Sequence, residues 1–154
     1  MLKKYLKNER GLTLVELLAV LVIIGIVAAI AIPSIGNIID NARRDAHVAN
    51  AKMMADAARQ WLAANPNQTF TSNSTSVTLE TLNQQGFINI PQFPGGGGFA
   101  YSPTNCQVTI TRAAVGTQGN FNYTYTVLLE RDGSNTDILN FNAETATRAN
   151  VTLP

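Results

Sequence analysis

Hydrophobic and polar positions divide this chain into a continuous apolar stretch, an amphipathic stretch and a stretch of alternating residues. Residues 17–32 contain no polar side chain, and the apolar stretch begins at Leu12 with only Thr13 and Glu16 interrupting it. About twenty apolar residues in a helix span the roughly 30 Å hydrocarbon core of a bilayer. The pattern therefore predicts a membrane-length helix over residues 12–33. Because a carboxylate in hydrocarbon is costly, Glu16 is a candidate functional residue.

The amphipathic stretch covers residues 34–65. Apolar side chains recur there at spacings of three and four between charged residues, as in a helix that packs one face on a core. The predicted stripe consists of Ile35, Ile39, Ala42, Ala46, Ala49, Met53, Ala57 and Trp61. Pro66 and its asparagine neighbours predict that the helix ends near Ala64. If both stretches form one helix, Pro33 is the expected site of a bend or local melting, since proline lacks the backbone donor.

Residues 66–154 are expected to form a globular region packed on residues 34–65. The polar segment 67–78 is predicted to be a surface loop, and residues 79–87 a short helix ended by Gly86. From Cys106 onward the period becomes two, which predicts three or four antiparallel strands. The candidate strands are residues 106–111, 121–130, 137–144 and 148–153. The predicted fold class is α+β: a long, gently bent N-terminal helix, packed through its C-terminal half on a small antiparallel β-sheet.

The distribution of charge predicts the orientation of the chain in a membrane, and the cysteine content excludes a disulfide framework. The net charge is +1, yet four bases, Lys3, Lys4, Lys7 and Arg10, precede Gly11. Positive residues before a span favour a cytoplasmic N-terminus, so the bulk of the chain is predicted to lie outside. A secretory signal peptide would have a shorter apolar region and a small-residue cleavage site, so the apolar stretch is expected to be retained. The single cysteine excludes an internal disulfide framework.

Candidate catalytic and metal-binding residues are few. His47 is expected in the solvent-rich part of the helix, and it forms a nucleophilic pair with Cys106 only if a third orienting group and a pocket exist. No second histidine or cysteine could complete a metal site. The stretch DGSNTD offers calcium the oxygens of Asp132, Asn135 and Asp137, but a hairpin turn is the favoured interpretation.

Basic residues beyond the long helix are sparse. They are Arg112, Arg131 and Arg148. A surface that follows a nucleic-acid backbone needs clustered cations, so no direct nucleic-acid binding is predicted. The glycine run in residues 94–99 is not followed by the GK[ST] of a phosphate-binding loop, and we expect a flexible connector there.

The stretch RGLTLVELLAVLVIIGIVAAIAIP, residues 10–33, resembles the N-terminal segment of type IV pilins and of the pseudopilins of type II secretion and competence systems. The matching features are a basic leader that ends at Gly11, the sequence Thr13-Leu14-Val15-Glu16 at the head of the apolar stretch, and then Gly25 and Pro33. The strong similarity covers residues 10–39; beyond it only the expected architecture is similar.

The resemblance implies a processing site and an assembly surface. A prepilin peptidase would cut the Gly11–Leu12 bond, remove the leader 1–11 and methylate the new amine of Leu12. Leucine departs here from the commonest residue, phenylalanine. Glu16 would then pair with the amine of a neighbouring subunit, while Gly25 and Pro33 belong to the helix through which subunits assemble.

The resemblance also implies a structural protein that is not an enzyme and needs no cofactor. Because some secretion pseudopilins bind calcium, a bound calcium ion is the weaker alternative to the absence of a cofactor. The precursor would be a single-pass protein of the cytoplasmic membrane and later part of an extracellular filament, or of a periplasmic or cell-wall pseudopilus. Its expected partners are copies of itself in a helical filament, the prepilin peptidase, and the inner-membrane assembly platform with its ATPase. A pseudopilin of a secretion or DNA-uptake system is the alternative, and a single-pass protein with an external binding domain is the remoter one.

Overall fold

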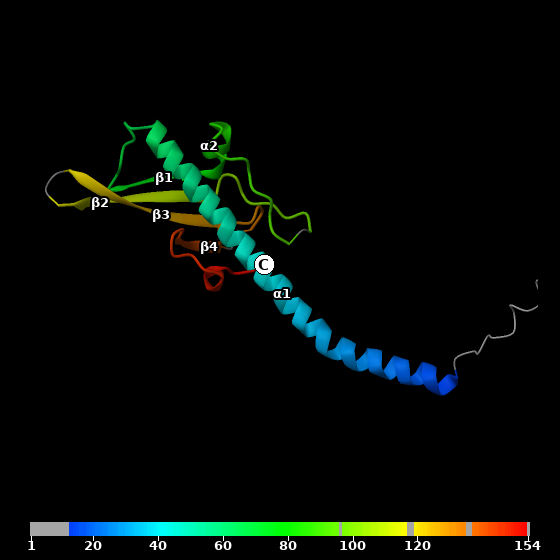
Figure 1. The fold of residues 1–154 in the computed structure, drawn as a ribbon. Coiled ribbons are helices and arrows are strands. Elements are labelled where there is room, and N and C mark those ends of the chain that lie inside the picture. Colours follow the sequence, from blue (N-terminus) through cyan, green and yellow to red (C-terminus); the bar gives the residue numbers. More distant parts are fainter. Residues whose placement is uncertain (1–12, 96, 117–118, 135–136, 154) are drawn as a thin grey trace, which may run out of the picture. The chain divides into compact units, whose positions relative to one another are not determined.

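The computed structural model describes residues 13–95, 97–116, 119–134 and 137–153. The chain divides into two compact units, Met1–Ile39 and Asp40–Pro154. The elements are α1 (Leu14–Ala64), β1 (Ser74–Thr78), α2 (Leu79–Gln84), β2 (Gln107–Val115), β3 (Asn120–Glu130), β4 (Asp137–Asn142) and the 3-10 helix η1 (Arg148–Asn150) (Figure 1). A long helix followed by a four-stranded antiparallel sheet confirms the α+β class and is the arrangement of the pilin fold.

Helix α1 ends where the sequence predicts. The backbone amide of Asn65 donates to the carbonyl of Trp61 at 3.0 Å, and its side-chain amide donates to the same carbonyl at 2.8 Å. These bonds satisfy a carbonyl that the terminating helix would otherwise leave free, and Pro66 cannot extend the helix. The helix runs through Pro33 without interruption, so no local melting occurs there.

The sheet is a meander in which every strand pairs antiparallel with the next one along the chain. Its order is β1-β2-β3-β4. The β2–β3 pair is the longest, from Gln107 opposite Leu128 to Val115 opposite Asn120. The β3–β4 pair contains an irregularity at Leu129/Glu130, after which Glu130 lies opposite Asp137. Strands β3 and β4 are therefore the two arms of a hairpin, as the favoured interpretation of residues 132–137 predicted, while residues 135–136 of the turn lie outside the described residues.

The short helix α2 confirms its prediction in detail. Thr78 caps its N-terminus by accepting a hydrogen bond from the amide of Thr81 at 3.2 Å. Gly86 follows the helix with φ of 78°, a conformation that glycine adopts without steric cost. Leu79 and Leu82 are fully buried, so this short helix adds apolar surface to the core.

Two predictions for residues 66–154 are wrong. The segment 67–78 is not a loop throughout, because its last five residues form β1 along the edge of β2. Burial of Val77, which is 3% exposed, holds this strand, while serine and threonine tolerate the half-exposed edge. Residues 148–153 are not a strand, because the amide of Asn150 donates to the carbonyl of Thr147 at 3.0 Å and closes a 3-10 turn. The side-chain oxygen of Asn150 caps this turn by accepting from the amide of Thr147.

The core of the second unit lies between α1 and one face of the sheet. The buried residues of α1 are His47, Val48, Ala51, Met54, Ala55, Ala57, Ala58 and Trp61. The sheet contributes Val108, Ile110, Tyr125, Val127, Leu129 and Leu139 to the same cluster. Only Ala57 and Trp61 of the predicted stripe are buried, and Met53 is 52% exposed. Alanines occur on every side of this helix, so their spacing in the sequence does not show which side is buried. The side that packs against the sheet is the buried one.

The alanines at the contact between helix and sheet permit a matched test. Ala58 has no exposed surface and Ala63 is exposed on the same helix. Ala58→Leu is expected to lower the free energy of unfolding by about 1–3 kcal/mol, because a larger side chain overpacks a filled contact. Ala63→Leu is expected to stay within about 0.5 kcal/mol of wild type. Denaturant unfolding followed by the fluorescence of Trp61 measures both, and equal effects would contradict the helix orientation.

Candidate functional site

The first turn of α1 holds Thr13 and Glu16 in a reciprocal pair. The backbone amide and the hydroxyl of Thr13 each donate to Oε2 of Glu16 at 2.9 Å. The amide of Glu16 donates in return to Oγ1 of Thr13 at 3.2 Å. The carbonyl of Thr13 accepts the first helical bond, from Leu17 at 3.1 Å, so Thr13 is the N-cap residue. This geometry is a capping box, in which two amides at the helix start are satisfied at once.

The capping box gives Glu16 a role that the sequence analysis missed. Its signal, a threonine followed three residues later by a glutamate, is present in the sequence. A negative charge in the first turn is also favoured by the helix dipole. The carboxylate is therefore placed and oriented by its own helix, and Oε1 makes no hydrogen bond within the described residues.

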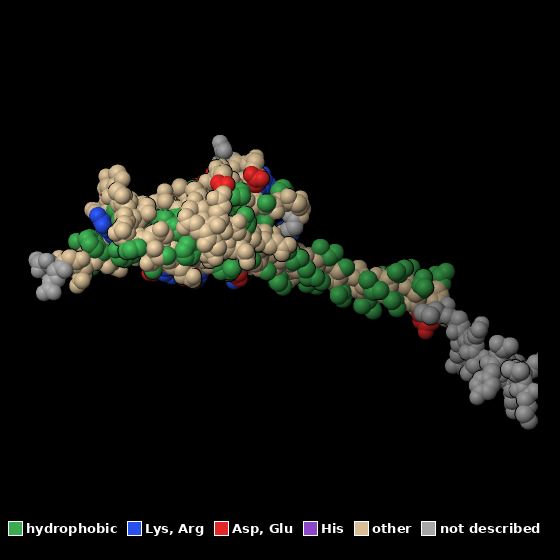
Figure 2. All heavy atoms as spheres, turned by 90° about the horizontal axis from the view of Figure 1, so that it is seen from above, with side chains coloured by type: hydrophobic (Ala, Val, Ile, Leu, Met, Phe, Trp, Pro, Cys, Tyr) green, Lys and Arg blue, Asp and Glu red, His purple; other side chains and the backbone are tan. Residues whose placement is uncertain are grey.

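The rest of α1 in the first unit presents apolar side chains to its surroundings. Within residues 13–39 no side chain is buried, and large exposed apolar residues continue from Leu14 to Ile39. Figure 2 shows hydrophobic side chains along the visible face of this segment. The segment is long and apolar enough to cross a membrane. A Cβ added at Gly25 would meet no atom within 4 Å, so this glycine leaves the backbone open to close approach by another helix.

The predicted processing site lies outside the described residues. Gly11 and Leu12 precede the first described residue, Thr13. The cleavage and methylation at these two residues therefore stay predictions from the sequence.

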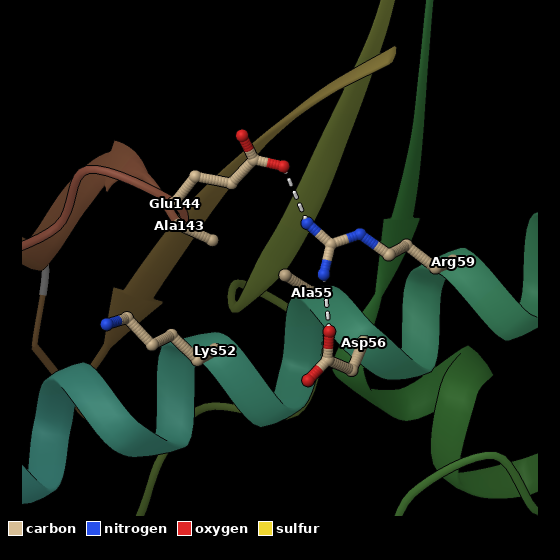
Figure 3. Close-up of a pocket in the computed structure, with 6 residues that line it drawn as sticks. All are labelled: Lys52, Ala55, Asp56, Arg59, Ala143 and Glu144. Atoms are coloured by element: carbon tan, nitrogen blue, oxygen red, sulfur yellow. Dashed lines mark hydrogen bonds and ion pairs between the residues drawn. The ribbon is translucent and has the colours of Figure 1, made fainter.

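A charged hollow of about 170 Å³ opens between α1 and the segment after β4 (Figure 3). Arg59 pairs there with Asp56 and, at 2.9 Å, with Glu144, and its guanidinium lies 4.8 Å from the centre of the Tyr125 ring. The lining residues are Lys52, Ala55, Asp56, Arg59, Ala143 and Glu144. The paired side chains are 39–61% exposed, so these ion pairs stabilise little. Arg59 thus connects the chain after β4 to the helix, and the hollow holds no nucleophile with an adjacent base.

The prediction that His47 lies in the solvent-rich part of the helix is wrong. Its side chain is fully buried, and Nδ1 lies 2.7 Å from the hydroxyl of Tyr101. The Phe93 ring meets the imidazole edge-on at 5.0 Å. Asn50 donates to the Tyr101 hydroxyl and to the carbonyl of Gln92, both at 3.1 Å. Together these contacts attach the connector between α2 and β2 to the helix.

Burial sets the protonation of this cluster. It lowers the pKa of His47 to about 4 and raises the pKa of Tyr101, because the charged form of each side chain is disfavoured away from water. Nε2 of His47 has no hydrogen-bond partner among the described residues. At neutral pH the imidazole is therefore an uncharged structural group.

Cys106 does not form the catalytic pair that the sequence analysis considered. Its thiol donates to the carbonyl of Glu130 at 3.3 Å and accepts from the amide of the same residue at 3.2 Å. Burial raises the pKa of Cys106 to about 11, so the thiolate needed of a nucleophile is not present at neutral pH. His47 bonds Tyr101 instead, and the two residues occupy separate hydrogen-bond networks.

The calcium candidates are only partly described. Asn135 lies outside the described residues, and Asp137 accepts a hydrogen bond from Asn140 at 3.4 Å. The described residues contain no group of three or more histidine, cysteine, aspartate or glutamate side chains that could hold a metal ion.

The three arginines that follow α1 in the chain are each engaged by a neighbouring side chain. Arg112 lies over the rings of Phe70 and Phe121, at 4.5 and 4.9 Å, and Arg131 lies 4.7 Å from the ring of Phe99. Arg148 pairs with Asp45 through two hydrogen bonds of 2.7 and 3.0 Å, and so joins η1 to α1. Their guanidinium groups serve internal contacts rather than a cationic surface.

Comparison with known proteins identifies one segment. Residues 6–32 match the family described as the prokaryotic N-terminal methylation motif, which is the signal-peptide motif of type IV pilins. No curated protein and no solved structure matches the chain. The chain thus carries the N-terminal motif of a pilin-like or pseudopilin precursor, and residues 14–32 of this motif lie on the apolar part of α1.

Proposed function

We propose that this chain is a prepilin, the structural subunit of a type IV pilus or a closely related filament. The precursor is anchored in the cytoplasmic membrane by residues 12–33, with its N-terminus in the cytoplasm. The prepilin peptidase cuts after Gly11, and the mature chain, beginning at Leu12, assembles with copies of itself on a membrane platform driven by a separate ATPase.

One observation carries the proposal: residues 14–32 of the matched motif lie on a helix in which no side chain is buried as far as residue 39. An apolar surface of this extent is unfavourable in water, so it must be covered by another apolar surface, either lipid or neighbouring helices. In this proposal the bilayer covers the helix with lipid before assembly, and the filament covers it with neighbouring helices afterwards. The motif supports the processing that separates the two stages.

The capping box fits the chemistry of processing. A cut after Gly11 leaves Leu12 attached to Thr13, so the Thr13 amide that bonds Glu16 is still an amide in the mature chain. The new amine of Leu12 is cationic near neutral pH. Since Oε2 of Glu16 accepts both bonds from Thr13, Oε1 is open to the amine of a neighbouring subunit. The contact specifies subunit register, while the apolar helix supplies most of the affinity.

Co-expression with a prepilin peptidase tests the processing step. We expect the mass of the wild-type chain to fall by the mass of residues 1–11, and Gly11→Val to stay uncut. Gly25→Val is the matched control, because it places the same side chain in the same segment at an open position and should be cut normally. A wild-type mass that the peptidase leaves unchanged, or equal cutting of Gly11→Val, would refute the proposed processing.

A further inference from the structure

Arg112 is a half-buried cation that no carboxylate neutralises within the described residues of its own chain. Its guanidinium lies 4.5 Å from the centre of the Phe70 ring and 4.9 Å from that of Phe121. Nε is buried without a hydrogen-bond partner, whereas the two terminal nitrogens stay accessible and make no hydrogen bond within the described residues. Phe121 is 42% exposed, so the group lies at the surface. We call Phe70, Arg112 and Phe121 the arginine site.

The arginine site is suited to a single carboxylate. The two terminal nitrogens of a guanidinium can donate in parallel to the two oxygens of one carboxylate. The neighbouring rings restrict the side chain and keep water from it, which strengthens an ion pair formed at its edge. Arg131 and Arg148 contact Phe99 and Asp45 instead, so neither adds a second cation to the site. A nucleic-acid backbone is bound through several cations, so one arginine does not fit it.

Two carboxylates at the other end of the sheet lack a cation. Strand register places Glu130 opposite Asp137, and like charges directly opposite each other destabilise a strand pair. Neither residue forms an ion pair within the described residues, where Asp137 accepts only the 3.4 Å bond from Asn140. We call Glu130 and Asp137 the acid pair. A guanidinium supplied by another chain would relieve the repulsion between them.

The arginine site and the acid pair lie on opposite faces of the sheet and at different ends of it. Arg112 alternates with the buried Ile110 and so shares the face that α1 covers, whereas Glu130 follows the buried Leu129 and belongs to the other face. Arg112 lies opposite Tyr123 of β3, and Glu130 lies further along the same strand, roughly 24 Å away. One copy therefore cannot join the two groups, but two copies can. Such a heterologous contact repeats from copy to copy and builds a filament unless it closes into a ring.

We propose that the arginine site of one copy binds the acid pair of the next copy in the filament. The inference rests on the proposed function, because it assigns a contact within that filament. Lys52 also has no ion pair within the described residues, but it lines the same hollow as Asp56 and Glu144 and already has negative charge nearby. Arg112 is the better match, since no carboxylate of its own chain competes for it.

Neutralising either side tests the contact. We expect Arg112→Gln and the double variant Glu130→Gln/Asp137→Asn each to lower the yield of sheared fibres at least about fivefold, with the cut after Gly11 unchanged. The double variant should melt at the wild-type temperature or above it, since it removes a like-charge pair. A loss of fibres without a loss of stability distinguishes a contact between copies from a contribution to folding.

Arg131→Gln is the matched control, because Arg131 is also half-buried, lies against the Phe99 ring and has no ion pair within the described residues. It should assemble like wild type. Reversing both sides, in Arg112→Glu/Glu130→Lys/Asp137→Lys, should recover fibres that Arg112→Glu alone loses. The inference is overturned if Arg112→Gln or the neutralised acid pair assembles as well as Arg131→Gln, or if the reversed chain assembles no better than Arg112→Glu. A wild-type chain that is cut but forms no fibre would instead refute the proposed function.

Discussion

Glu16→Gln is expected to lower the yield of assembled fibres at least about tenfold without changing the cut after Gly11. Glutamine keeps a side-chain oxygen that can accept the two bonds from Thr13, so the capping box survives the substitution. What disappears is the negative charge that would face a neighbour's amine. The prediction thus separates the charge of Glu16 from its role in starting the helix. Fibres sheared from cells and quantified against total chain measure the effect.

Glu80→Gln supplies the matched control for this charge. Glu80 also lies in the first turn of a helix, α2, and is exposed. The same substitution there should leave fibre yield unchanged. If Glu16→Gln assembles as well as Glu80→Gln, an ionic contact at Glu16 plays no part in assembly, and only its capping role stands.

Acid is expected to destabilise the second unit through His47. Burial lowers the pKa of His47 to about 4, against a usual value of about 6.5, so the unfolded chain binds a proton more readily than the folded one. Stability from this group is therefore complete above pH 6.5 and is lost as pH falls toward 4. Between pH 7.5 and pH 5 the expected loss is about 2 kcal/mol in the free energy of unfolding. Trp61, the single tryptophan, reports the transition from within the core.

His47→Gln is the control for the acid effect. Glutamine cannot titrate, and its amide can still bond the hydroxyl of Tyr101, so the variant should lose much less stability between pH 7.5 and pH 5. Its stability at pH 7.5 is expected to be lower than that of wild type, because a different shape replaces a packed ring. A wild-type chain as insensitive to this pH range as His47→Gln would contradict the buried, neutral imidazole.

Local sequence signals predicted the elements that depend on local chemistry. Asn65 and Pro66 stop α1, Gly86 stops α2, and the period of two marks β2 and β3 because one face of each is buried. These features require only neighbouring residues and a single apolar contact surface. They were therefore readable before the fold was known.

Features that depend on distant partners were not predictable in the same way. The buried side of α1 was assigned wrongly because alanine fits either a covered or an exposed position, so Ala51 and Ala55 are indistinguishable from Ala42 and Ala49 by type. His47 is buried because Tyr101, 54 residues away, supplies a hydrogen bond. Strand β1 carries one buried side chain, Val77, and only its pairing with β2 distinguishes it from a loop.

The first turn of α1, residues 13–16, contains one feature that the sequence predicted and one that it did not. Glu16 is recognisable as unusual from its charge in an apolar stretch, and the motif identifies its surroundings. Its hydrogen bonds to Thr13 follow from a spacing that is also visible in the sequence, yet they become meaningful only once Leu14 is known to begin the helix.

Mass spectrometry of fibres sheared from the surface of cells that express this chain tests the proposed function most directly. The expected result is a fibre composed mainly of this chain, beginning at Leu12 with a methylated amine. A chain found only in the membrane fraction, with residues 1–11 intact in the presence of an active prepilin peptidase, would contradict it.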